Sequence, residues 1–243
     1  MTLRVVASEA AVALDLWLWP LEAAPERRAG LAAHLDASEL ARAEGYHRES
    51  DRAAFEVARG RMREILGGYL GCAPRAVPLV TGPHGRPLLG TGAAGRGPAF
   101  NLAHAGGWAA LVTGLHRLAL GIDIEPWREV EPEVAARFFS PAERAELAAL
   151  PPDQWRAGFF NAWTRKEALL KALGSGLMRP LDSFDVTLTP AAPARLTRLS
   201  GAVASRWQLR PLELRHDFPG CIALRHAGPV ALTVREGALP LPA

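Results

Sequence analysis

Residues 163–171 read Trp-Thr-Arg-Lys-Glu-Ala-Leu-Leu-Lys and lie within 153–173, a stretch that begins after two prolines and ends before a glycine. Prolines before the stretch and a glycine after it predict one long helix. Trp163, Glu167 and Lys171 are spaced four residues apart, so they occupy one stripe of that helix. A tryptophan on this stripe indicates that the stripe is partly covered, which favours a site over an exposed glutamate–lysine pair.

Lys166 and Lys171 are the only lysines among 28 basic residues. The chain uses arginine at every other basic position. Lysine supplies a compact ammonium group that can lose a proton, which arginine effectively cannot. The two lysines therefore indicate positions where a point charge is needed, although two lysines can also fall close together by chance.

Two carboxylates close a predicted strand, 118–124, which Pro126 terminates. Strand periodicity places Asp123 and Glu125 on one face, where they repel each other unless a cation neutralises them or one is protonated. Oxygen-only ligands favour Mg²⁺, or Mn²⁺, over zinc. The pair alone could equally form surface salt bridges. Glu167 adds a third carboxylate with flanking ammonium groups, which is what a Mg²⁺-bridged diphosphate requires.

The rest of the chain alternates helix and strand patterns around a midpoint near residues 115–120. Helices are predicted over 24–35, 38–46 (with Ser38 as N-cap), 49–70 and from a capping box at Ser140. Strands are predicted over 12–19, 108–113, 118–124, 183–188, 207–214, 221–225 and 231–235. Residues 74–97 form a connection rich in glycine and proline, and 100–107 a glycine-ended turn. Each half thus offers helices and a small sheet.

Charge and composition limit the classes of protein. Residues 57–122 carry seven arginines against one acid, a net charge of +6, and 123–167 carry nine acids against six bases, a net charge of −3. This order suits a site where an anionic ligand meets a metal, although a basic run is often only a solvated face. No apolar run reaches the ~20 residues of a membrane span, and no secretory leader is visible. Two cysteines, Cys72 and Cys221, make no disulfide framework, so we expect a cytoplasmic protein.

Four motifs in sequence order resemble the phosphopantetheinyl transferases of the larger, pseudo-dimeric class, the surfactin-synthetase type. They are Gly85-Arg86-Pro87, Phe100-Asn101-Leu102-Ala103-His104, Gly121-Ile122-Asp123-Ile124-Glu125, and Trp163-Thr164-Arg165-Lys166-Glu167-Ala168 running on to Lys171 and Gly174. Residues 137–140 and 180–184 also look like the family. The resemblance covers roughly residues 12–225.

The resemblance implies a Mg²⁺-dependent enzyme that transfers 4′-phosphopantetheine from coenzyme A to a serine of an apo acyl or peptidyl carrier protein and releases adenosine 3′,5′-bisphosphate. It implies an α/β (α+β) fold of two similar subdomains related by a pseudo-two-fold, each a small sheet with packed helices. Residues 1–118 would form the N-terminal half, with the coenzyme A phosphate contacts. Residues 119–243 would form the C-terminal half, with the metal and catalytic residues. A chain of two halves also implies a monomer.

The motif positions imply roles for single residues. Asp123, Glu125 and Glu167 would hold Mg²⁺ against the diphosphate of coenzyme A. Glu167 would also be the base for the serine hydroxyl, and Lys171 would hold the diphosphate and assist departure of the ADP oxygen. Cationic residues would contact the coenzyme A phosphates: Arg52, Arg59, Arg86, His104, Lys166 and Lys171.

Two departures from the family pattern concern coenzyme A binding. Many relatives have serines beside the motif histidine, whereas Ala103 and Ala105 flank His104. A lost hydrogen bond to a charged group costs roughly 1.5–3 kcal/mol unless water or an arginine replaces it. Lysines that often lie in the first helices of relatives also have no counterpart in this chain. Arg42 and Arg48 are the nearby candidates to replace them.

Two other classes of protein compete with the transferase. A non-catalytic module that binds coenzyme A or carrier protein predicts a damaged acid triad, and the triad is intact in the sequence. A nucleic-acid binder requires aromatic residues interleaved with the basic ones. Residues 57–122 offer only Tyr69, Phe100 and Trp108. We therefore expect an enzyme without a nucleic-acid or membrane partner.

Overall fold

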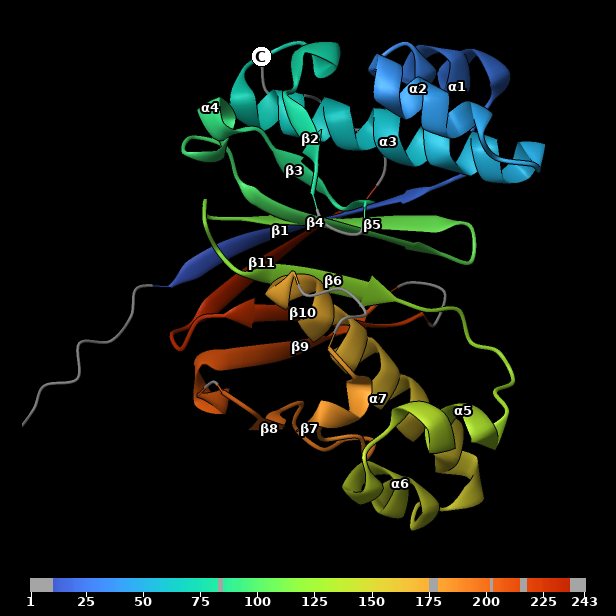
Figure 1. The fold of residues 1–243 in the computed structure, drawn as a ribbon, viewed down its shortest axis with the longest axis vertical. Coiled ribbons are helices and arrows are strands. Elements are labelled where there is room, and N and C mark those ends of the chain that lie inside the picture. The colour runs from blue at the N-terminus through green and yellow to red at the C-terminus, as the bar shows by residue number, and fades with distance from the viewer. Residues whose placement is uncertain (1–10, 83–84, 175–178, 202, 215–217, 237–243) are drawn as a thin grey trace, which may run out of the picture.

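The computed structural model describes residues 11–82, 85–174, 179–201, 203–214 and 218–236. Two units of helix and sheet stack so that their sheets face each other (Figure 1). This mixed α/β arrangement of small sheets with packed helices confirms the predicted fold class. No helix among these residues has the length and apolar character needed to cross a bilayer.

The upper unit in Figure 1 is a four-stranded sheet covered by helices on one face. Its strands, in spatial order, are β11 (Val230–Glu236), β1 (Val12–Pro20), β5 (Trp108–Gly114) and β4 (Ala99–Ala105). Its helices are α1 (Pro25–Ala32), α2 (Ala37–Glu44) and α3 (Glu49–Leu70). A short 3-10 turn (Pro74–Ala76), a hairpin of β2 (Leu79–Thr81) and β3 (Pro87–Leu89), and α4 (Thr91–Ala94) lead from α3 to β4. The predicted connection 74–97 thus contains secondary structure of its own.

The lower unit is a three-stranded sheet against the longest C-terminal helix. Its strands, in spatial order, are β6 (Leu120–Ile124), β10 (Pro219–Arg225) and β9 (Trp207–Glu213). The helices are α5 (Pro132–Phe138), α6 (Pro141–Ala148) and α7 (Pro152–Leu173). A ribbon of β7 (Phe184–Val186) and β8 (Leu196–Leu199) completes the unit, with 3-10 turns at Leu181–Ser183 and Ala204–Arg206.

The last strand, β11, lies outside the unit to which chain order assigns it. It runs parallel to β1, with Val12 paired to Val230 and Leu18 to Glu236. The division of the chain between residues 118 and 119 remains a prediction. Strand β11 follows that boundary in the sequence but belongs to the sheet of the N-terminal unit. The two units therefore share a strand as well as an interface.

An apolar core joins the two sheets. Leu14 and Leu16 of β1 meet Ile122 of β6 and Ile222 of β10, and all four are buried. Each fully buried aliphatic side chain of this kind contributes about 1.5–3 kcal/mol. The relative placement of the two units is therefore set by hydrophobic packing.

The two long helices follow the same local rules. α3 and α7 each span 22 residues and end at a left-handed glycine, Gly71 with φ of 64° and Gly174 with φ of 68°. Glycine adopts this conformation without a Cβ penalty, so it terminates a helix. The predicted bounds 49–70 and 153–173 agree with the structure to one residue.

Two local predictions are wrong. Residues 100–107 were expected as a turn, but strand β4 extends to Ala105 and only Gly106 and Gly107 turn, both with positive φ. Polar Asn101 and His104 interrupt the apolar pattern that identifies a strand. The cap of α2 is Asp36 instead of Ser38, because the Asp36 carboxylate accepts the Glu39 amide at 3.0 Å and forms a capping box.

Candidate active site

A cavity of about 410 Å³ lies between the two units. Residues of α2, α3, the β2–β3 loop and β4 line one side, and residues of α7 line the other. Of the predicted site residues, Arg59, Arg86, His104, Glu167 and Lys171 face this cavity. The structure thus brings together side chains that are as much as 112 positions apart in the sequence, counting from 59 to 171.

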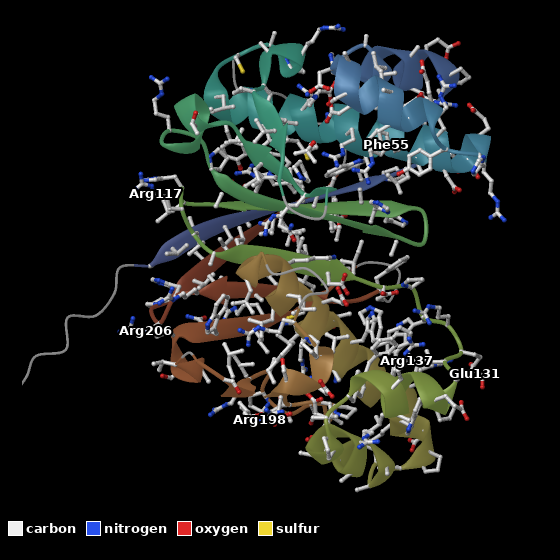
Figure 2. The ribbon with its side chains drawn as sticks, viewed as in Figure 1. Phe55, Arg117, Glu131, Arg137, Arg198 and Arg206 are labelled. Carbon is white, nitrogen blue, oxygen red and sulfur yellow. The ribbon has the colours of Figure 1, made fainter. Side chains whose placement is uncertain are left out.

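The N-terminal side of the cavity is cationic. The guanidinium groups of Arg42 and Arg59 lie over the Phe55 ring, 5.5 and 5.4 Å from its centroid. Figure 2 shows Phe55 in the helical layer of the N-terminal unit, far from Arg198 of the β7–β8 ribbon. Partial loss of solvent, and then the charges of Lys171, Arg59 and Arg42, lower the pKa of His104. This concentration of positive charge suits a ligand with several phosphates.

Sequence reasoning missed the aromatic part of this wall. Phe55 packs against Tyr46 with ring centroids 5.5 Å apart, and both line the cavity with Arg42. Arg42 was only one of two nearby candidates for the missing family lysines. The available signal was that Tyr46 ends one predicted helix and Phe55 lies within the first two turns of the next, so both rings come near the start of α3.

A close approach of β6 to α7 places the carboxylate side of the site. A Cβ atom at Gly121 would lie 2.2 Å from the Ala168 carbonyl oxygen, so only glycine permits this contact. Asp123, two residues further along β6, thereby comes within reach of α7. Its Oδ1 atom lies 2.7 Å from the Nζ atom of Lys171, and its Oδ2 atom is buried without a hydrogen-bond partner.

Glu125 and Glu167 share the electrostatic environment of Asp123. Desolvation, and then the negative charge of Asp123, raise the pKa of Glu125 and of Glu167, and desolvation raises the pKa of Asp123 itself. Glu125 accepts a hydrogen bond from the indole Nε1 of Trp163 at 3.0 Å. Trp163 thus orients one of the predicted metal ligands, while Glu167 and Lys171 of the same stripe line the cavity.

The three carboxylates do not form a metal cage as they stand. Within the described ranges, no three His, Cys, Asp or Glu side chains converge closely enough to enclose a metal ion. The chemistry of the donors nevertheless fits a hard cation, because Asp123 Oδ2 is an orphaned buried oxygen and the neighbouring carboxylates repel one another. In this arrangement the Lys171 ammonium supplies the positive charge next to Asp123.

The prediction for Lys166 is wrong. Its side chain is fully buried in the C-terminal core, where Nζ donates to the carbonyl oxygens of Leu181 at 2.7 Å and Phe184 at 2.6 Å. An ion pair with Glu143 at 2.7 Å neutralises its charge. Lys166 is therefore not placed to contact coenzyme A, because its ammonium group is buried among core partners and does not line the cavity.

Two predicted phosphate ligands have protein partners. Arg52 is on the solvent side of α3, where Nε donates to Glu56 at 2.9 Å, and it is not among the cavity residues. Arg86 lines the cavity, but its guanidinium donates to backbone carbonyl oxygens of Phe100, Leu120 and Lys171. Both Nη atoms of Arg86 are thus engaged by the protein backbone, and only its buried Nε has no hydrogen-bond partner in the described structure.

A cationic wall opposite clustered carboxylates defines a protein that handles a phosphate-bearing substrate. Residues 119–223 match the model of the 4′-phosphopantetheinyl transferase superfamily. The 4′-phosphopantetheinyl transferase HetI of Nostoc sp. is 39% identical over 213 residues, which cover 86% of this chain and 85% of that protein. A 4′-phosphopantetheinyl transferase of Bacillus subtilis is 32% identical over 174 residues, covering 70% and 72%. The transferase Sfp of Bacillus subtilis is 39% identical over 89 residues, covering 37% and 39%.

The chain belongs to the 4′-phosphopantetheinyl transferase superfamily. It is an enzyme, and members of this family transfer 4′-phosphopantetheine from coenzyme A to a serine of a carrier protein. The resemblance to the surfactin-synthetase type, inferred from four short motifs, is thereby confirmed.

Proposed function

We propose that the transfer is Mg²⁺-dependent and takes place in the cavity between the two units. The observation that supports this most directly is that Glu167 and Lys171 line the cavity across from Arg42 and Arg59. Asp123 and Glu125 are not part of this lining but interact with Glu167 and Lys171. A divalent cation held by the three carboxylates would neutralise the diphosphate of coenzyme A and act as a Lewis acid. Mn²⁺ satisfies the same oxygen ligands.

The chain's own residues carry the proton and the developing charge. Glu167, whose pKa is raised, takes the proton from the carrier serine hydroxyl as its oxygen bonds to phosphorus. The bond from that phosphorus to the ADP oxygen breaks, and the leaving oxygen keeps the electron pair. Lys171 stabilises the negative charge on that oxygen after it exchanges Asp123 for the diphosphate.

The cationic wall binds the adenosine 3′,5′-bisphosphate part of coenzyme A. Arg59 is nearly buried and its only charged partner, Glu39, lies 3.8 Å away, so its guanidinium has hydrogen-bonding capacity to spare within the described structure. Forked contacts from arginine suit a terminal phosphate. Arg42 lines the same cavity and is the second arginine proposed for these contacts.

The carrier protein and the setting belong to the proposal as well. The acceptor is an apo acyl or peptidyl carrier protein, the enzyme is a monomer because one chain supplies both sides of the cavity, and it acts in the cytoplasm, where its two free thiols stay reduced.

Intact mass spectrometry tests the reaction. The protein is incubated with coenzyme A, Mg²⁺ and an apo acyl carrier protein, with a peptidyl carrier protein in parallel. We expect a gain of one phosphopantetheine on at least one carrier, abolished by EDTA and restored by excess Mg²⁺. Transfer that persists in EDTA would contradict the metal assignment, and no transfer to either carrier would contradict the acceptor class.

A further inference from the structure

Strands β4 and β6 lie side by side where the two units meet, but they belong to different sheets. No backbone ladder joins them among the described residues. Groups of β6 that point toward β4, the Leu120 carbonyl and the Ile122 amide, therefore need other partners. Side chains of the N-terminal unit supply both.

Asn101 satisfies the amide. Its Oδ1 atom accepts the Ile122 N–H at 2.8 Å, and the Asn101 side chain is almost completely buried. Ile122 is fully buried, so its N–H is shielded from solvent. Removing it would leave a buried N–H without a partner, which is costly. Asn101 thus fixes β6 to β4 one residue before Asp123.

Arg86 satisfies carbonyl groups on three elements. Its Nη2 atom donates to Phe100 of β4 at 3.2 Å and to Leu120 of β6 at 3.1 Å, and its Nη1 atom donates to the carbonyl of Lys171 in α7. A planar guanidinium with five donors can bridge three separated acceptors, whereas an ammonium group cannot span them in the same way. Arg86 thereby connects the β2–β3 loop to the site-bearing elements of the C-terminal unit.

We propose that Asn101 and Arg86 are positioning residues that hold β6 and the end of α7 against the N-terminal unit. Their task is to keep Asp123 and Lys171 opposite His104, so the proposal rests on the function proposed above for these residues. It assigns the Arg86 guanidinium to the protein backbone, in place of the phosphate contact that the family resemblance implies.

Steady-state kinetics with matched variants test this assignment after the wild-type protein has been shown to transfer. Asn101→Leu and Arg86→Met are compared with Arg96→Met. Arg96 is an exposed arginine that donates to the nearby carbonyl oxygen of Gly92. We expect both site variants to lower kcat at least tenfold at saturating substrates, with the Kd for 3′,5′-ADP within twofold of wild type. Arg42, Arg59 and His104, which bind that nucleotide, all lie on the N-terminal unit. Arg96→Met should match wild type.

Conservative variants separate positioning from binding and from folding. Asn101→Asp keeps an acceptor for the Ile122 amide and should recover most of kcat, whereas Arg86→Lys keeps the charge but not the three-way bridge and should remain impaired. A wild-type kcat for Asn101→Leu, or for Arg86→Lys with unchanged nucleotide Kd, would overturn the proposal. A raised Kd for 3′,5′-ADP in Arg86→Met with unchanged kcat would show that Arg86 binds the substrate. An inactive wild-type protein would instead contradict the proposed function.

Discussion

The Nζ atom of Lys171 lies 2.7 Å from Oδ1 of Asp123, so an ion pair joins the last turn of α7 to the end of β6. The pair places a positive charge beside the most buried of the three site carboxylates. The charge of Lys171 offsets part of the repulsion among these carboxylates. In the proposed function, binding of a cation to Asp123 would release Lys171 to the diphosphate, so the two events would be one exchange of partners.

This pair makes Lys171 the most sensitive basic residue of the site. Lys171→Ala should lower kcat about 100-fold, since removal of one preorganised donor to a developing negative charge has that effect. Lys171→Arg should also impair transfer, because a planar fork cannot replace a point charge held against one carboxylate oxygen. Carrier-protein mass gain over time measures both, and full activity of Lys171→Arg would contradict the need for an ammonium group.

Glu167→Gln should separate catalysis from stability. Loss of the base lowers kcat by about 100- to 10,000-fold, while binding of 3′,5′-ADP stays near the wild-type value. Without divalent cations the variant should have a higher Tm than wild type, because Asp123 and Glu125 no longer face a third negative charge. Adding Mg²⁺ should raise the Tm of wild type more than that of the variant. An unchanged turnover would contradict the role of Glu167 as base.

Lys166→Met should affect folding instead of substrate binding. Breaking a buried ion pair by removing one partner costs about 3–5 kcal/mol, because Glu143 is left with an uncompensated charge. Urea unfolding measures this loss, and Glu143→Gln in the same chain should recover part of it. The KM for coenzyme A should stay unchanged in the folded fraction. A raised KM for coenzyme A with unaltered stability would show that Lys166 acts in the active site after all.

The two thiols should differ in reactivity. Burial raises the pKa of Cys221 to about 12, whereas Cys72 is partly exposed. At about pH 8 a thiol reagent such as DTNB should therefore modify one cysteine in the native protein and two in urea. Cys72→Ser serves as the control and should leave no reactive thiol in the native state. Two reactive thiols in the native protein would show that the core around Cys221 opens.

Acid should destabilise the N-terminal helical layer. Desolvation acts to raise the pKa of Glu64, but hydrogen bonds from Arg27 and Arg61 outweigh it and hold the pKa below the ordinary 4.5. The unfolded chain then takes up a proton first as the pH falls. This stabilisation is therefore complete above about pH 4.5 and is lost as the pH falls through the lower folded pKa. Urea midpoints between about pH 7 and pH 3 measure the loss, and Glu64→Gln should show a shallower slope.

Local sequence determined the elements of this protein. Prolines, capping residues and glycines act within one helical turn, so the bounds of α3 and α7 follow from the residues that flank them. The same local rules do not predict strand β4, because its polar residues face the cavity and the neighbouring strand β6 and so break the apolar alternation. The placement of Asp123 and Glu125 on one face could likewise be predicted, since alternation along a strand is a local property.

Only the tertiary structure decided which residues share the site. The pairing of β11 with β1 joins positions more than 200 residues apart, as from Val12 to Val230, and no local signal specifies it. The three carbonyl contacts of Arg86 arise where separate elements converge. The two lysines show the physical reason most clearly. Five residues correspond to a rotation of about 140° around a helix, so α7 presents Lys171 to the cavity and Lys166 to the core.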